Sequence, residues 1–112
     1  MYCVEFWRDA GGGCPARDFL DGLPVKVRAK TAKWLQLLQE GGPDLKRPYA
    51  DMLADGIREL RLSFGRLEVR LLYFIEGREI VLTNGFLKKT RHTPTGEIER
   101  ARRSRAVWLA AR

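Results

Sequence analysis

The stretch Glu59-Leu-Arg-Leu-Ser-Phe-Gly-Arg-Leu-Glu-Val-Arg-Leu-Leu-Tyr-Phe74 alternates apolar and polar residues on both sides of Gly65-Arg66. Such alternation around a glycine-containing pair predicts two antiparallel strands joined by a two-residue turn. With Gly65 and Arg66 as the turn, Phe64 lies opposite Leu67. The register of the whole hairpin then follows by counting outward, because successive side chains on a strand point to opposite faces.

This register places Arg61 opposite Arg70 on one face of the hairpin. Two like charges in a cross-strand pair weaken a sheet, so a hairpin that keeps them is a candidate anion-binding element. The alternative is an ordinary solvated charged face. Glu68 lies diagonal to Arg61 in this register, and in that alternative it neutralises the arginine in a surface ion pair.

Outward from the hairpin, the pattern predicts strands over about 57–64, 67–75 and 78–87, with a second two-residue turn at Glu76-Gly77. That turn pairs Arg70 with Thr83. The face that forms the core collects Leu60, Leu62, Phe64, Val69, Leu71, Tyr73, Ile80 and Leu82. The other face is polar near the first turn and apolar at its far end, where it carries Leu72, Phe74 and Val81. This apolar end needs a cover, either the C-terminal helix or a partner protein.

Two helices are expected before these strands. After a short strand over about Tyr2–Arg8, a short helix is predicted over Ala16–Leu20. Pro24 opens a longer helix, since proline is tolerated in the first helical turn, and Gly41-Gly42-Pro43 ends it. The apolar stripe of this longer helix is core scaffold and consists of Val27, Thr31, Trp34, Leu35 and Leu38.

A last helix is predicted from about Thr95 to Ala110, with Thr93 or Thr95 as its N-terminal cap. All these elements together predict a single α+β domain over residues 1–112. Its architecture is a small antiparallel sheet with N-terminal helices and a C-terminal helix packed on it.

The net charge of +7 is concentrated late in the chain. From Phe86 onward eight Lys and Arg residues are set against two Glu, which leaves +6 in the last 27 residues. This asymmetry indicates a polyanionic partner, namely RNA, DNA or an acidic protein, and a solvated basic helix is the alternative. There is no membrane-spanning apolar run or signal-peptide pattern. Cys3 and Cys14 form no metal motif or disulfide framework, so a reduced cytoplasmic setting is expected.

No phosphate-binding P-loop, glycine-rich dinucleotide fingerprint or His/Cys metal cluster occurs in the sequence. His92 is the only histidine. A lone histidine in a surface loop is usually just solvated, yet its unperturbed pKa suits proton transfer near neutral pH. Lys89 follows Thr83 by an even number of residues, so their side chains point to the same face of a continuous strand. If the last strand continues, the ammonium group of Lys89 therefore lies on the face of Arg61 and Arg70.

Basic groups from three consecutive segments would then converge on one shallow basin. RNA carries its own nucleophile, the 2′-hydroxyl group, so its cleavage needs neither a protein nucleophile nor a metal. It needs a geometry for in-line attack, positive charge on the pentacoordinate phosphorane and a proton for the departing 5′-oxygen. A basin of arginine and lysine with one nearby histidine could meet these needs, and we expect no cofactor and no metal site.

Several motifs occur in a fixed order along the chain: Phe19-Leu-Asp-Gly-Leu-Pro-Val-Lys-Val-Arg-Ala-Lys30, Gly42-Pro-Asp-Leu-Lys-Arg-Pro-Tyr49, Glu59-Leu-Arg-Leu-Ser-Phe-Gly65, Val69-Arg-Leu-Leu-Tyr-Phe74, Gly85-Phe-Leu-Lys-Lys-Thr90, Thr93-Pro94 and Glu97-Ile-Glu-Arg-Ala101. With these motifs the chain resembles the phage-derived HigB-like branch of the RelE toxins over about residues 16–108. The resemblance implies a RelE-like fold and a type II toxin, an endonuclease that cuts mRNA in the ribosomal A site.

The resemblance also implies a cognate antitoxin, in this branch typically a small helix-turn-helix protein, and contact with operator DNA only through the antitoxin complex. We expect no contact with a membrane. The basic residues that RelE-type toxins carry on the central strands and just after the last one match Arg61, Arg70, Lys88 and Lys89. His92 stands where relatives often carry lysine or another residue.

We therefore expect a catalytic set of Arg61, Arg70, Lys89 and His92, and RNA contacts from Lys88, Arg91 and Arg58. The alternative function is a nucleic-acid-binding protein without catalysis, or a toxin homologue that has lost activity.

Overall fold

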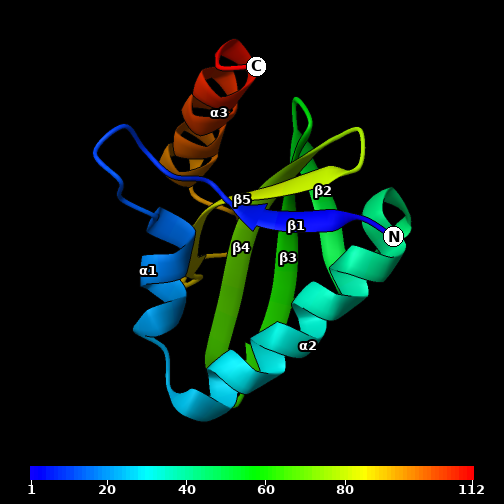
Figure 1. The fold of residues 1–112 in the computed structure, drawn as a ribbon. Helices are drawn as coiled ribbons and strands as arrows, with labels where there is room; N and C mark the ends of the chain where they lie inside the picture. The colour runs from blue at the N-terminus through cyan, green and yellow to red at the C-terminus, as the bar shows by residue number, and fades with distance from the viewer.

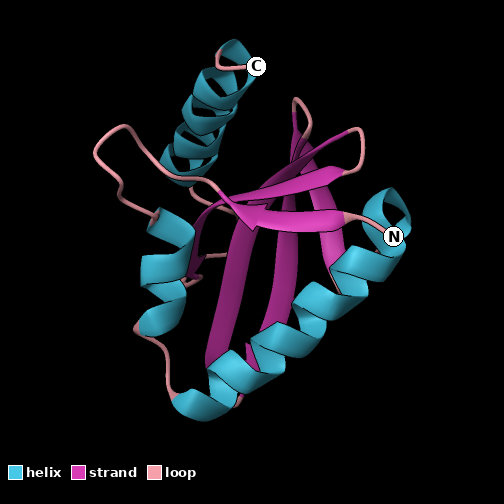
Figure 2. Cartoon of the chain, in the orientation of Figure 1, coloured by secondary structure: helices cyan, strands magenta, loops and turns pink.

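The structure, a computed structural model, describes residues 1–112. A five-stranded sheet carries α1 and α2 on one face and α3 on the other (Figures 1 and 2). The elements in chain order are β1 (Cys3–Phe6), α1 (Pro15–Asp21), α2 (Val25–Gly41), the 3₁₀ helix η1 (Gly42–Asp44), β2 (Ala50–Ala54), β3 (Ile57–Phe64), β4 (Leu67–Glu76), β5 (Glu79–Leu87) and α3 (Thr95–Ala110). The predicted α+β class is confirmed.

The strands lie in the order β1-β5-β4-β3-β2. Strands β2 to β5 are antiparallel neighbours, as predicted for the sheet, and β1 adds one parallel edge strand beside β5. The strand β2 was not predicted from the sequence. A two-residue Asp55-Gly56 turn, with φ of 49° and 82°, joins β2 to β3 and pairs Ala54 with Ile57. An Asp-Gly pair with positive φ at both residues is a strong hairpin signal.

The predicted register of the β3–β4 hairpin is confirmed. Phe64 pairs with Leu67 across Gly65-Arg66, and Arg61 pairs with Arg70. Gly65 has a φ of 59°, a left-handed conformation that glycine adopts at no steric cost.

The predicted register of the next hairpin is wrong. Its turn is Gly77-Arg78 rather than Glu76-Gly77, because Gly77, with a φ of 60°, takes the first loop position as Gly65 does. In addition, β5 has an irregularity at Thr83, since Tyr73 pairs with Leu82 while Leu72 pairs with Asn84. The residue opposite Arg70 is therefore Phe86 and not Thr83.

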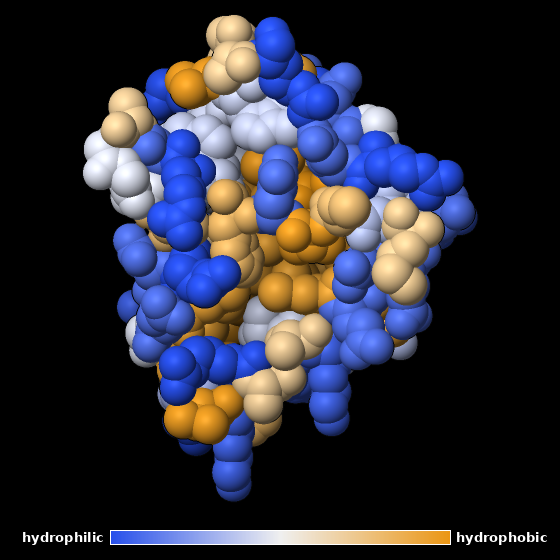
Figure 3. Space-filling model, viewed as in Figure 1, coloured by the Kyte–Doolittle hydropathy of each residue, from blue (hydrophilic) through white to orange (hydrophobic).

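The main core lies between the sheet and the first two helices. It contains the predicted sheet residues together with residues of α1 and α2: Ala16, Leu20, Leu23, Val27 and Leu38. A hollow of about 630 Å³ opens between β1 and the helices, lined by Val4, Phe6 and Leu35 among others. Figure 3 shows hydrophobic residues gathered at this hollow and hydrophilic residues around it.

The opposite face has a smaller core of its own beneath α3. Leu72, Phe74 and Val81 are fully buried there with Ile57 and Ala101. The ring of Trp108 meets that of Phe74 edge-on at 5.3 Å. The apolar end of this face is therefore covered by the C-terminal helix, one of the two predicted covers.

Tyr73 lies in the main core with no hydrogen-bond partner for its hydroxyl group. Burial raises the pKa of Tyr73 to about 12 from an ordinary value of 10.0. The folded protein holds the Tyr73 proton more tightly than the unfolded chain does. The resulting contribution to the free energy of unfolding is therefore intact below pH 10 and is lost between about pH 10 and pH 12. The loss amounts to about 3 kcal/mol.

We expect Tyr73→Phe to remove this part of the alkaline loss of stability. At pH 7 it should leave the free energy of unfolding unchanged or higher, because it removes a buried unpaired hydroxyl group. Urea unfolding at several pH values checks this, with the exposed Tyr49→Phe as control. Parallel losses of stability in Tyr73→Phe and the wild type above pH 10 would contradict the assignment.

Candidate functional site

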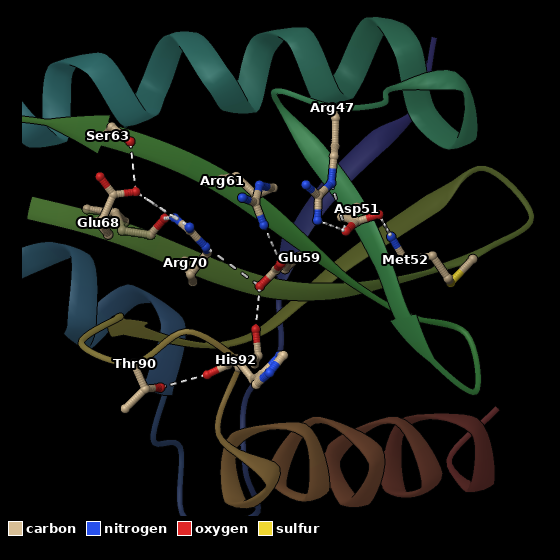
Figure 4. A network of polar contacts seen from close by, with 12 residues as sticks. Arg47, Asp51, Met52, Glu59, Arg61, Ser63, Glu68, Arg70, Thr90 and His92 are labelled. Carbon is tan, nitrogen blue, oxygen red and sulfur yellow. Dashed lines mark hydrogen bonds and ion pairs between the residues drawn. The ribbon is translucent and has the colours of Figure 1, made fainter.

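Arg61 and Arg70 face one open groove on the α3 side of the sheet (Figure 4). The groove has a volume of about 460 Å³, and its lining is wholly polar or proline: Arg47, Pro48, Arg61, Ser63, Glu68 and Arg70. The predicted juxtaposition of the two arginines is thus present, and a third arginine, Arg47, joins them. Such a concentration of fixed positive charge can bind an anion.

Glu59 links the two central arginines from beneath, and its side chain is only 2 % exposed. One carboxylate oxygen, Oε2, accepts a hydrogen bond from Arg61 Nη1 at 2.8 Å. The other, Oε1, lies 3.7 Å from Arg70 Nε and accepts a hydrogen bond from Thr93 Oγ1 at 2.7 Å. The like charges of the cross-strand pair are therefore held together by a buried carboxylate that the sequence analysis did not single out.

Glu68 contacts Arg70 rather than Arg61, which corrects the predicted ion pair. Its Oε1 lies 3.5 Å from both Arg70 Nη1 and Nη2, and it accepts a shorter bond from Ser63 Oγ at 2.8 Å. Because the Glu68 side chain is 42 % exposed and its contacts with Arg70 are long, this pair is weak compared with the Glu59 network.

Arg70 forms the floor of the groove and is only 4 % exposed. The predicted polar face is present, but Arg70 is buried within it and is not exposed as on a solvated surface. Burial lowers the pKa of Arg70, and the charge of Arg61 lowers it further, while Glu59 and Glu68 act in the opposite direction. An arginine nevertheless keeps its proton in proteins. Arg70 is consequently a fixed cation with restricted motion.

Arg47 reaches the groove from the segment before β2. It donates to Asp51 Oδ2 from Nε at 3.1 Å and from Nη2 at 2.8 Å. These hydrogen bonds hold the pKa of Asp51 below its ordinary value. Arg47 was missed because the strand that positions its partner was missed as well.

The basic loop after β5 lies beside the groove. Lys88 N–H donates to Glu68 O at 2.8 Å, and Thr93 reaches Glu59. The register places Phe86 opposite Arg70 and Lys88 opposite Glu68, so Lys88, rather than Lys89, continues the face of the groove. The predicted direction of the Lys89 side chain is wrong because β5 has one extra residue at Thr83. This extra residue turns every later side chain of β5 to the opposite face of the sheet.

The remaining loop residues are exposed. Lys89, Arg91 and His92 have no side-chain hydrogen bond or ion pair; only the carbonyl oxygen of His92 is engaged, by Thr90 Oγ1 at 2.7 Å. Neither predicted threonine caps α3, since Pro94 precedes the helix and Thr93 is committed to Glu59.

Arg58 does not reach the groove. On β3 its side chain points to the face opposite to that of Glu59 and Arg61. Its Nη1 donates to Pro43 O, beside the end of α2, at 3.2 Å. The structure thus places the predicted RNA contact Arg58 on the other face of the sheet.

Much of the predicted basic surface on α3 is neutralised within the protein. Arg102 pairs with Asp55 at 2.6 Å and Glu99 at 2.8 Å, Arg100 pairs with Glu97, and Arg112 pairs with Glu79. The late cations without a carboxylate partner are Lys88, Lys89, Arg91, Arg103 and Arg105, of which Arg105 donates to Asp55 O. No three His, Cys, Asp or Glu residues lie close enough together to hold a metal ion. No helix has the length and apolar character to cross a membrane.

Residues 18–106 match the sequence profile of the family described as "Phage derived protein Gp49-like (DUF891)". The chain belongs to this family. A search of curated proteins finds no match. The Gp49-like family is related to the RelE and HigB toxins, and the sheet with its helices fits the RelE-like fold. Membership in a toxin–antitoxin family implies an antitoxin partner. The matched region contains the whole groove and the basic loop.

Proposed function

We propose that this Gp49-like protein is a HigB-like toxin that cuts mRNA on the ribosome. The observation that carries the proposal is the Arg61–Arg70 pair, which a buried glutamate holds at the floor of a groove beside an exposed basic loop. Preorganised cations in a partly desolvated site can stabilise charge that develops during a reaction at phosphorus. The loop supplies charges that can attract the RNA backbone.

In the proposed reaction the RNA 2′-hydroxyl group releases its proton to the surrounding solvent, its oxygen attacks the adjacent phosphorus, and the bond to the 5′-oxygen breaks. The products are a 2′,3′-cyclic phosphate and a 5′-hydroxyl end. Arg61 and Arg70 would stabilise the phosphorane oxygens, and Arg47 would orient the phosphate from the rim. The departing 5′-oxygen needs a proton, for which His92, Lys88 and Lys89 are the candidates near the groove.

The proposed setting is the bacterial cytoplasm, where the toxin meets mRNA on the ribosome. Its partner would be a small helix-turn-helix antitoxin, and the complex of the two would bind operator DNA. An exposed loop rich in unpaired cations is compatible with an anionic partner of this size.

A test of this function uses purified protein and ribosomes programmed with a defined mRNA. We expect cleavage only when the ribosome is present, with cyclic phosphate at the new 3′ ends. Induced expression should arrest growth, and co-expression of an adjacent helix-turn-helix gene should restore it. Intact mRNA together with normal growth, at full protein expression, would refute the proposal.

One observation favours the second candidate, a nucleic-acid-binding protein without catalysis. Both central arginines already contact carboxylates, and the His92 side chain has no bond that directs it into the groove. In this case the protein would bind RNA or ribosomes with the same salt dependence, and the mRNA would stay intact.

The exposed loop should account for much of the salt dependence of binding. We expect replacement of Lys88, Lys89 and Arg91 by glutamine to weaken binding to ribosomes or RNA. The slope of log affinity against log salt should fall by about 2, because three phosphate contacts are lost at about 0.7 each. A titration at several salt concentrations measures this slope. An unchanged slope would show that the loop is only a solvated surface.

His92 is one of three candidates for the proton donor, with Lys88 and Lys89. If it protonates the leaving oxygen, His92→Gln should slow single-turnover cleavage on ribosomes and leave ribosome affinity nearly unchanged. The pH–rate profile should also lose a limb near the ordinary histidine pKa of about 6.5. Wild-type rate and profile in this variant would make Lys88 or Lys89 the better proton donor.

A further inference from the structure

The N-terminal half of α2 carries a second basic surface that the groove does not include. Lys26, Lys30 and Lys33 recur at i, i+4 and i+7, so they lie along one side of the helix. Together with Ala29, Trp34 and Phe64 they line an open hollow of about 430 Å³ that contains no acidic side chain. We call this surface the α2 lysine stripe.

The charges of this stripe are not neutralised within the protein. Lys26 and Lys33 are exposed and have no hydrogen bond or ion pair, and the only acidic residue of α2, Glu40, lies at its far end. Lys30 bonds a carbonyl oxygen and lies 5.2 Å from the ring centroid of Trp34, so it also lacks a carboxylate. Like charges four residues apart weaken a helix, which indicates that the stripe serves an anionic ligand.

The stripe is continuous with the groove because the sheet edge is open between them. β2 pairs with residues 57–60 of β3, and Arg61 N–H donates to Tyr49 O at 2.7 Å, so only residues 62–64 have no backbone neighbour on that side. Two side chains of α2 bond carbonyl groups at this end of β3: Trp34 Nε1 donates to Arg61 O at 2.8 Å, and Lys30 Nζ donates to Ser63 O at 2.5 Å.

Ser63 lies in the groove and is bonded by a lysine of the α2 lysine stripe. Its hydroxyl group lies in the groove and bonds Glu68, while its carbonyl oxygen accepts the bond from Lys30. Figure 4 shows this end of β3 beside α2, with Ser63, Arg61 and Arg47 following one another toward the other end of the groove.

We propose that an RNA strand held in the groove continues over the open edge of β3 onto the α2 lysine stripe. This rests on the proposed RNA-binding function and adds a second contact for the same strand. Lysine binds phosphate as a flexible point charge, so the stripe would read the RNA backbone and not its sequence. A short RNA would fill only the groove, whereas a longer one would reach the stripe.

The test compares two 2′-O-methyl RNAs, which cannot be cleaved, of about four and about twelve nucleotides. We expect Lys26→Gln/Lys33→Gln to weaken binding of the longer RNA and to lower its salt slope by about 1.4, at about 0.7 per lost contact. Binding of the shorter RNA should stay at the wild-type value. Lys30 is left intact because it bonds the sheet edge.

The control variant is Arg8→Gln/Arg103→Gln, which removes two exposed cations that line other hollows. It should not distinguish the two RNAs by length. Equal effects of the α2 variant on both RNAs, or no effect on either, would overturn the proposal. So would a loss confined to ribosome binding or to antitoxin binding, since the stripe would then meet a different partner. A length effect without any mRNA cleavage on ribosomes would uphold the stripe and refute the toxin function.

Discussion

Arg70→Ala should reduce mRNA cleavage at least about a hundredfold, which is the typical effect of removing one preorganised charge stabiliser. Arg70 lies at the floor of the groove on a central strand, and Glu59 and Glu68 restrict its position. Water that replaces the guanidinium group cannot supply a fixed positive charge. Because Arg70 is buried, the substitution should also lower the free energy of unfolding by about 1–3 kcal/mol.

Single-turnover cleavage on programmed ribosomes measures the first effect and urea unfolding measures the second. Arg112→Ala provides the control, since it removes an arginine that follows α3 and pairs with Glu79 of β5, outside the groove. Arg70→Lys keeps a charge but loses the guanidinium fork, so its rate should lie between those of the wild type and the alanine variant. A wild-type cleavage rate in a folded Arg70→Ala protein would refute the assignment of the groove as the active site.

Glu59→Ala should be the most destabilising of the substitutions considered. It removes the carboxylate shared by Arg61, Arg70 and Thr93, and it leaves a buried cation beside a second cation. Removal of one partner from a buried ion pair typically costs about 3–5 kcal/mol. We expect a loss of this size in urea unfolding, together with loosening of the loop that Thr93 anchors.

The matched comparison is Glu68→Ala, because Glu68 contacts Arg70 from the exposed side of the same groove. Its ion pair should contribute less than about 1 kcal/mol. Glu59→Gln preserves the shape and an acceptor for Thr93, so it isolates the effect of the charge. Similar small losses for Glu59→Ala and Glu68→Ala would show that Glu59 does not hold the two arginines together.

The position of the first hairpin was predictable because local chemistry determines it. Gly65 begins a two-residue turn, the flanking residues alternate, and the pairing of Arg61 with Arg70 follows. The second turn has the same Gly-Arg pair at Gly77-Arg78 and was placed one residue early. Placing the second glycine at the first loop position, as in the first hairpin, would have given the observed turn at Gly77-Arg78. The irregularity at Thr83 depends on cross-strand contacts and has no comparable local signal.

The charged residues of the site were predictable from the sequence, but the burial of Glu59 and Arg70 was not. Alternation assigned Glu59 and Arg70 to the polar face but did not indicate that they are buried. Thr93, which bonds Glu59, lies 34 residues away in the sequence. Diagonal pairing was considered only between Glu68 and Arg61, although Glu59 has the equivalent relation to Arg70. Parity alone would have excluded Arg58, since it differs from Arg61 by an odd number of residues.

The parallel pairing of β1 with β5 affects when the chain can fold during its synthesis. β5 lies between β1 and β4, so the sheet cannot be completed before residue 87 has left the ribosomal exit tunnel. Trp108 then donates to Glu5 at 3.1 Å, which ties the last helix to the first strand. Long-range pairing of this kind delays folding until both segments are present. A nascent chain therefore reaches its complete fold only after β5 and Trp108 have both left the exit tunnel.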